Sequence, residues 1–240
     1  MKRSHFIYMI ILNVLVIAFG VMTLYYLNAY NRERTKISTD IRAWDSSFQF
    51  SQFYHKMNEY YQRRDAFLED KLLVIGDSHV QGLAVNHISA NAVNLGIAGD
   101  TIFGVLHRAS MYQSIKQARG VVIEAGVNDI KYFTDETILE NFSSFFQLVP
   151  STIPVYINSI IPVQNIMGVV DIDNDRIRML NQKLFRLCES FPHCRFVNIT
   201  PLLADMSGNL RTDLCLKDGI HLNQRGNRVW LDELNRIISR

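Results

Sequence analysis

Short apolar runs alternate with longer segments whose apolar residues recur every three or four positions. Each run predicts a buried strand. The five runs cover residues 72–75, 92–95, 120–125, 154–158 and 195–199. The segments between and after them predict helices at residues 102–117, 136–148, 176–190 and 223–238. Strands that alternate with helices indicate a parallel sheet with helices on both faces. With right-handed crossovers, we expect an α/β fold, a three-layer α/β/α sandwich around a five-stranded parallel sheet.

A longer apolar stretch, residues 6–27, precedes this pattern and is interrupted only by Asn13, Gly20 and Thr23. About 22 residues at a rise of 1.5 Å span roughly 33 Å, which is enough to cross a hydrocarbon core. A cleaved signal peptide normally has a shorter apolar region and a small-residue cleavage site, and no such site follows Leu27. A buried helix that is apolar on all sides suits a globular domain of this size poorly. We therefore expect residues 1–30 to hold an uncleaved transmembrane helix.

Charged residues on either side of the apolar stretch leave its orientation nearly undecided. Lys2 and Arg3 precede it, while Arg32, Arg34 and Lys36 follow it. A large domain after one N-terminal span favours a signal-anchor. We therefore expect a single-pass membrane protein whose domain is exported to the periplasm or the cell exterior.

A polar segment, residues 31–70, links this anchor to the region of alternating strands and helices. Several of its apolar residues fall three or four positions apart, at Phe50, Phe53, Tyr54, Met57 and Tyr61. This spacing predicts one or two amphipathic helices that pack against the domain, and an aromatic ligand cage is the alternative. The domain itself is expected to occupy residues 71–240.

Composition narrows the possible partners. The chain has 240 residues with 25 Lys and Arg against 23 Asp and Glu, so no polyanion-binding surface is indicated and we expect no nucleic-acid partner. Cys188, Cys194 and Cys215 show no metal-site spacing. Cys188 and Cys194 could form a disulfide in an oxidising compartment, but the sequence does not establish one. The sequence does not establish the oligomeric state either.

Polar clusters follow four of the predicted strands. They are Gly76-Asp77-Ser78, Gly99-Asp100, Gly126-Val127-Asn128-Asp129 and Asp218-Gly219-Ile220-His221. The carboxyl ends of parallel strands share one edge of a sheet, so we expect all four clusters to meet around one crevice.

The four clusters supply the groups that acyl transfer requires. Ser78 offers a hydroxyl nucleophile, and His221 is a suitable base, because histidine side chains change protonation near neutral pH. Asp218 lies three residues before His221 and can orient the imidazole. The N–H groups of Ser78 and Gly99 and the side-chain amide of Asn128 are candidate oxyanion donors.

Each cluster also has a structural explanation. Gly76-Asp77-Ser78 suits a turn followed by a helix N-cap, and Gly99 suits an ordinary turn. Asn128 suits a helix cap, and His221 is compatible with a hydrogen-bonded structural histidine. Four such clusters in the required order, each after a strand, favour the catalytic interpretation.

These blocks resemble those of the SGNH, or GDSL-type, serine hydrolases over roughly residues 72–238. The resemblance implies a flavodoxin-like fold, the catalytic residues Ser78, Asp218 and His221, an oxyanion hole of Ser78, Gly99 and Asn128, and neither metal nor cofactor. Residues 94–101 and 218–223 are similar to the small-ester branch, which includes acetylesterases. His79 departs from the family pattern, and we expect it to contact the catalytic residues rather than to act in catalysis.

The sequence therefore predicts a membrane-anchored serine esterase that hydrolyses a short-chain carboxylic ester, for example an O-acetyl group, through an acyl-enzyme. The substrate would be a small ester or an acylated carbohydrate or lipid. An O-acyltransferase, a lysophospholipase or a thioesterase would use the same residues. A non-catalytic envelope assembly protein is a further alternative, although a scaffold has no need for Ser78, Asp218 and His221 together.

Overall fold

The computed structural model of the chain describes residues 16, 19–27, 51–165 and 172–239. It separates into two units, residues 1–43 and residues 44–240. In the first unit residues 19–27 are helical. No helix within the described ranges is both long and apolar enough to cross a membrane. The predicted anchor lies partly outside these ranges, because they omit residues 6–15 and 17–18.

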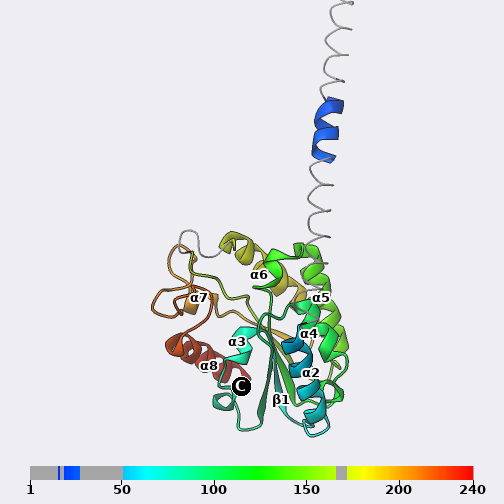
Figure 1. Cartoon of the computed structure of the whole chain (residues 1–240), viewed down its shortest axis with the longest axis vertical. Helices are drawn as coiled ribbons and strands as arrows, with labels where there is room; N and C mark the ends of the chain where they lie inside the picture. The colour runs from blue at the N-terminus through cyan, green and yellow to red at the C-terminus, as the bar shows by residue number, and fades with distance from the viewer. Residues whose placement is uncertain (1–15, 17–18, 28–50, 166–171, 240) are drawn as a thin grey trace, which may run out of the picture. The chain divides into compact units, whose positions relative to one another are not determined.

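A five-stranded, all-parallel sheet forms the centre of the second unit and confirms the predicted α/β sandwich (Figure 1). In sheet order the strands are β2 (Ala92–Gly96), β1 (Leu72–Gly76), β3 (Gly120–Glu124), β4 (Val155–Asn158) and β5 (Cys194–Val197). Strand β2, which follows β1 in the chain, pairs with one edge of β1, and β3 pairs with its opposite edge. This reversal of strand order opens a crevice at the carboxyl ends of β1 and β3.

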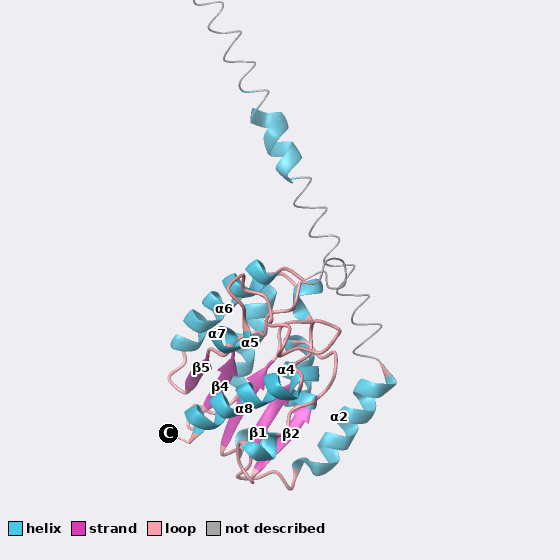
Figure 2. Ribbon diagram, turned by 90° about the vertical axis from the view of Figure 1, so that its left-hand side faces the viewer, coloured by secondary structure: helices cyan, strands magenta, loops and turns pink. Residues whose placement is uncertain are grey.

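Helices cover both faces of the sheet (Figures 1 and 2). One face carries α3 (Ser78–Gln81) and α8 (Gln224–Ile238), and the other carries α4 (Ile102–Ala109), α5 (Asp135–Leu148) and α6 (Asn174–Glu189). Short turns of helix lie at η2 (Val85–His87), η3 (Gln113–Lys116), η4 (Asp129–Lys131) and α7 (Thr200–Leu203). Alternate residues of each strand point to opposite faces, so Leu72 and Val74 join the core around Trp230 of α8.

Two of the predicted boundaries are wrong, the first for a tertiary reason and the second for a local one. The helix expected at residues 102–117 ends at Ala109, and a separate turn, η3, begins at Gln113. The carboxylate of Asp65 caps that turn by accepting from the N–H groups of Gln113 at 2.6 Å and Ser114 at 3.2 Å. The strand expected at residues 195–199 stops at Val197, because Pro201 stands in the first turn of α7.

Helix α2 (Gln52–Asp65) forms from the described part of the predicted connector. The Ser51 hydroxyl caps it by accepting from the N–H of Tyr54 at 3.1 Å. Its buried residues recur at helical spacing and are Tyr54, Asn58, Tyr61 and Asp65. The face they form packs on the rest of the second unit near the carboxyl end of β2 (Figure 2).

The structure pairs Cys188 with Cys194, which the sequence left open. The disulfide joins the last turn of α6 to the first residue of β5, with the two Cα atoms 5.3 Å apart. Cys215 is free and half-buried.

Candidate active site

Ser78 lies at the point where β1 turns into α3, at the crevice between β1 and β3. Asp77 caps the short helix, because its carboxylate accepts the N–H of His79 at 2.9 Å. Gly76 is required at the turn, since a Cβ atom there would lie 1.9 Å from the carbonyl oxygen of Glu124. The Ser78 side chain is therefore held half-exposed at the edge of the sheet.

A hydrogen-bonded chain joins Ser78 to His221 and Asp218. The Ser78 Oγ lies 2.8 Å from His221 Nε2, and His221 Nδ1 lies 2.7 Å from Asp218 Oδ2. Asp218 Oδ1 also accepts the N–H groups of Ile220 and His221, at 2.9 and 3.0 Å. Burial alone would raise the pKa of Asp218, but these hydrogen bonds hold the pKa below its usual range. An ionised Asp218 places the imidazole proton on Nδ1 and leaves Nε2 to accept from the Ser78 hydroxyl.

Gly99 and Asn128 lie on two further loops at the same edge. Gly99 has a φ of 77°, in the left-handed region that glycine adopts without strain. The Asn128 side chain donates from Nδ2 to the carbonyl oxygen of Asp100 at 2.9 Å. It makes no capping hydrogen bond to the turn that follows it, η4, which removes the helix-cap explanation for this residue. The second Nδ2 hydrogen of an amide remains for another acceptor.

A small hollow of about 180 Å³ adjoins these residues. Its walls are formed by Gly99, Val127, Asn128, Lys131, Tyr132, Ile172 and Ile220. Most of the lining is apolar, and Asn128, Lys131 and Tyr132 are the lining residues with polar side chains. Within the described part of the chain, no three His, Cys, Asp or Glu residues come together in a way that would hold a metal ion.

His79 is buried beside His221, with the two ring centroids 5.4 Å apart. Neither ring nitrogen of His79 has a hydrogen-bond partner among the described residues. Burial, followed by the charge of His221, lowers the pKa of His79 to about 3, so the ring is neutral at working pH. The position fits the expected contact with the catalytic residues, and a ring whose two nitrogens have no hydrogen-bond partner among the described residues has no group within reach for proton transfer.

Two buried carboxyl groups beneath Ser78 belong to Asp77 and Glu124, and the sequence did not indicate the second. Glu124 is completely buried at the end of β3, opposite Gly76 in the sheet register. Apart from each other's carboxyl group, the two Glu124 oxygens and Asp77 Oδ2 have no hydrogen-bond partner among the described residues. Burial and then the charge of Asp77 raise the pKa of Glu124 well above its usual range, while burial raises the pKa of Asp77 to about 7. Burial therefore favours the protonated form of Glu124, and the two neighbouring carboxyl groups titrate as a pair.

Asp129, the neighbour of Asn128, links the loop after β3 to α4. Its two carboxylate oxygens both lie 3.1 Å from the backbone nitrogen of Ile102, the first residue of α4. The side chain is completely buried, and burial raises its pKa. A charged residue directly after an apolar run, as at Glu124 after residues 121–123, was the available signal for this buried layer.

The residues of the candidate site fall in the part of the chain that resembles known proteins. A model of the GDSL-like lipase/acylhydrolase family matches residues 74–229, which include all four polar clusters. No curated protein sequence matches the chain.

Several solved structures have the same fold. A structure titled as a putative platelet activating factor from Streptococcus pneumonia has a TM-score of 0.72 and 24% identity, covering 78% of this chain and 93% of that one. A GDSL-like lipase from Bacteroides thetaiotaomicron has a TM-score of 0.66 and 21% identity, with coverages of 76% and 97%. A lipase/acylhydrolase from Enterococcus faecalis has a TM-score of 0.61 and 20% identity, with coverages of 70% and 95%. At these identities the likeness establishes the fold.

Proposed function

The chain belongs to the GDSL-like lipase/acylhydrolase family and is a carboxylic ester hydrolase, and from that premise we propose that Ser78 is its nucleophile. His221 is the general base and Asp218 orients it. The observation that carries the proposal is the 2.8 Å contact between Ser78 Oγ and His221 Nε2, which joins residues 143 positions apart in the chain. A nucleophile within hydrogen-bond reach of a base, itself oriented by a carboxylate, is the arrangement that acyl transfer needs.

The reaction proceeds in two halves. His221 takes the Ser78 proton as Oγ attacks the ester carbonyl, and the imidazolium then gives that proton to the departing alkoxide, so an alcohol leaves and an acyl-enzyme remains. Water next attacks the acyl carbon while His221 accepts its proton. The imidazolium returns this proton to Ser78 Oγ as the acid is released, which restores the starting enzyme.

Three donors would stabilise the oxyanion formed in each half. They are the N–H groups of Ser78 and Gly99 and the free amide hydrogen of Asn128. The Asn128 amide is already fixed by its hydrogen bond to the Asp100 carbonyl, so its second hydrogen needs no reorganisation when charge develops.

We propose a short acyl group, such as acetyl, on the basis of the hollow beside Gly99 and Asn128. Its volume of about 180 Å³ is smaller than the ~300–1,000 Å³ typical of pockets for larger ligands. Long acyl chains would extend beyond its apolar walls.

The expected result with p-nitrophenyl esters is a kcat/KM that falls at least about tenfold from acetate to octanoate, because added methylenes find no matching surface. The full chain in detergent is assayed, and the rate of a Ser78→Ala protein is subtracted as background. A kcat/KM that rises steadily with chain length would contradict the short-acyl assignment and favour a lipase-like or thioesterase-like substrate.

We also propose that residues 6–27 anchor the protein in a membrane with its catalytic domain exported. The supporting observations are the apolar stretch itself and the disulfide between Cys188 and Cys194, since disulfides persist mainly in oxidising compartments. Exported ester substrates would include acylated polysaccharides of the envelope.

An anchor held by apolar burial should keep the protein in the membrane fraction through high salt and alkaline carbonate, because neither treatment weakens hydrophobic insertion. A reporter that requires export should be active when fused after Arg240. Release by carbonate would argue against a membrane span, and activity of a cytoplasm-only reporter would reverse the topology.

A further inference from the structure

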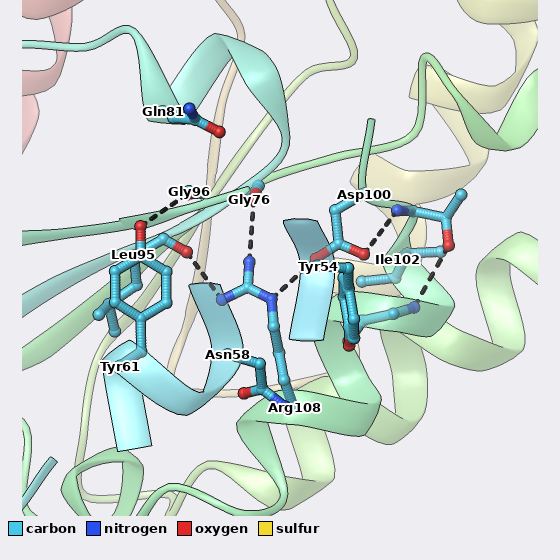
Figure 3. Close-up of polar contacts among 12 residues, drawn as sticks. Tyr54, Asn58, Tyr61, Gly76, Gln81, Leu95, Gly96, Asp100, Ile102 and Arg108 are labelled. Atoms are coloured by element: carbon cyan, nitrogen blue, oxygen red, sulfur yellow. Dashed lines mark hydrogen bonds and ion pairs between the residues drawn. The ribbon is translucent and has the colours of Figure 1, made fainter. Parts of the chain in front are cut away.

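One completely buried guanidinium lies beneath the loops that carry the proposed site. Arg108 is in the last turn of α4 and has no exposed side-chain surface. Its Nε donates to Asp100 Oδ2 at 2.7 Å, Nη1 donates to the carbonyl oxygen of Leu95 at 2.7 Å, and Nη2 donates to that of Gly76 at 2.9 Å (Figure 3).

Each of these three acceptors is close in sequence to a proposed catalytic group. Gly76 ends β1 two residues before Ser78. Leu95 lies in β2 before the loop that contains Gly99, and Asp100 follows Gly99 directly. The backbone of Asp100 in turn accepts the Asn128 amide. Arg108 therefore connects, directly or through one residue, every loop that supplies the nucleophile and the oxyanion donors.

Helix α2 covers this guanidinium and adds two hydrogen bonds to the same loops. The hydroxyl of Tyr61 donates to the carbonyl oxygen of Gly96 at 2.7 Å (Figure 3). The hydroxyl of Tyr54 donates to the carbonyl oxygen of Gly104, in α4, at 3.1 Å. Both tyrosines are almost fully buried, so α2 keeps water from the ion pair between Arg108 and Asp100. Helix α2 lies before the residues matched by the family model.

Electrostatics keep the pair ionised at neutral pH. Burial outweighs the attraction of Arg108 and raises the pKa of Asp100 to about 6, which still leaves Asp100 charged at pH 7. An ion pair without water is stronger and more rigid than one in solvent.

We propose that Arg108, with Tyr61 and Tyr54 of α2, positions the oxyanion hole of the esterase. The inference rests on the proposed function, because it concerns the placement of Gly99 and Asn128 around the ester carbonyl. Oxyanion donors are effective only when they are held in place before charge develops. The planar guanidinium satisfies three acceptors on separate segments at once, which a lysine ammonium on its single stem cannot reproduce.

Arg108→Lys keeps the charge and removes the planar fork. We expect kcat to fall about 10- to 100-fold, as for other displacements of about 1 Å at a reacting centre, while KM stays within about twofold of wild type. The full chain is used, with circular dichroism and thermal unfolding to establish that the variant is folded. Leu184→Ala is the control: it opens a cavity in the core on α6, which supplies no proposed catalytic group. It should lower the melting temperature and leave kcat unchanged.

If Arg108→Lys does not fold, Tyr61→Phe tests the same proposal, because this substitution removes only the hydroxyl that donates to the Gly96 carbonyl oxygen. We expect about a 3- to 10-fold lower kcat with an unchanged KM. A kcat equal to that of the wild type in folded Arg108→Lys or Tyr61→Phe would overturn the inference. A fall in kcat of the same size in Leu184→Ala would also overturn it. In each of these outcomes a normal reaction of Ser78 with a fluorophosphonate would leave the proposed function standing. Failure of the wild type to react or to hydrolyse any ester would overturn the function instead.

Discussion

Ser78→Ala should abolish ester hydrolysis, with a loss in kcat on the order of 10⁵-fold or more, because no other group can form the acyl-enzyme. The variant loses one hydrogen bond, to His221, at a half-buried position. Its free energy of unfolding should therefore change by only about 1 kcal/mol. A fluorophosphonate probe, which reacts with activated serines, should label the wild type and leave Ser78→Ala unlabelled. The two measurements separate loss of the nucleophile from loss of the fold.

Ser110→Ala provides a matched control for this experiment. Ser110 is exposed at the end of α4, where its hydroxyl donates to the carbonyl oxygen of His107 at 2.7 Å. This substitution should change neither labelling nor hydrolysis. Full labelling of folded Ser78→Ala would remove Ser78 from the mechanism and would favour an envelope assembly protein that keeps the hydrolase fold without its activity.

The sheet was predictable because its strands carry their information locally. Residues 72–75 and 121–123 are apolar at successive positions, which is typical of strands buried on both faces by crossover helices. Where a boundary depended on another part of the chain, the prediction failed. The break between α4 and η3 requires Asp65, which lies 48 residues before Gln113 and caps η3 only after α2 has packed.

The candidate site also contains residues that local sequence patterns indicate and one residue, Arg108, whose role depends on tertiary packing. Ser78 and Asn128 could be selected from sequence because each lies in a polar cluster after an apolar run, and His221 because Asp218 lies three residues before it. Arg108 could not, since a basic residue in the last turn of an amphipathic helix is typical of a solvent-facing position that complements the helix dipole. In the fold it lies against the ends of β1 and β2, where its guanidinium bonds to Gly76 and Leu95, and it is completely buried.

Asn128→Ala should lower kcat on the order of 10²–10³-fold, equivalent to about 3–4 kcal/mol, if its amide stabilises charge that appears only in the transition state. KM should change much less than kcat, because the ground-state ester gains little from that donor. Asn141→Ala is a suitable control. Its amide is also partly buried and donates to a backbone carbonyl, that of Thr137, at 2.8 Å, but it lies on α5. The control should keep wild-type kinetics, which would show that losing a partly buried amide is not itself sufficient to slow turnover.

Asn128→Asp tests the sign of the interaction. An ionised carboxylate cannot donate to the Asp100 carbonyl or to the oxyanion, and it would repel both, so the variant should be at least as slow as Asn128→Ala. A residue needed only to start the turn η4 would behave differently, because aspartate serves as a cap about as well as asparagine. Near-normal kcat in folded Asn128→Asp would therefore exclude the amide from the oxyanion hole. Stabilisation of the oxyanion would then depend on the N–H groups of Ser78 and Gly99 alone, and the hydrogen bond from Asn128 to Asp100 would serve only to join the loops after β2 and β3.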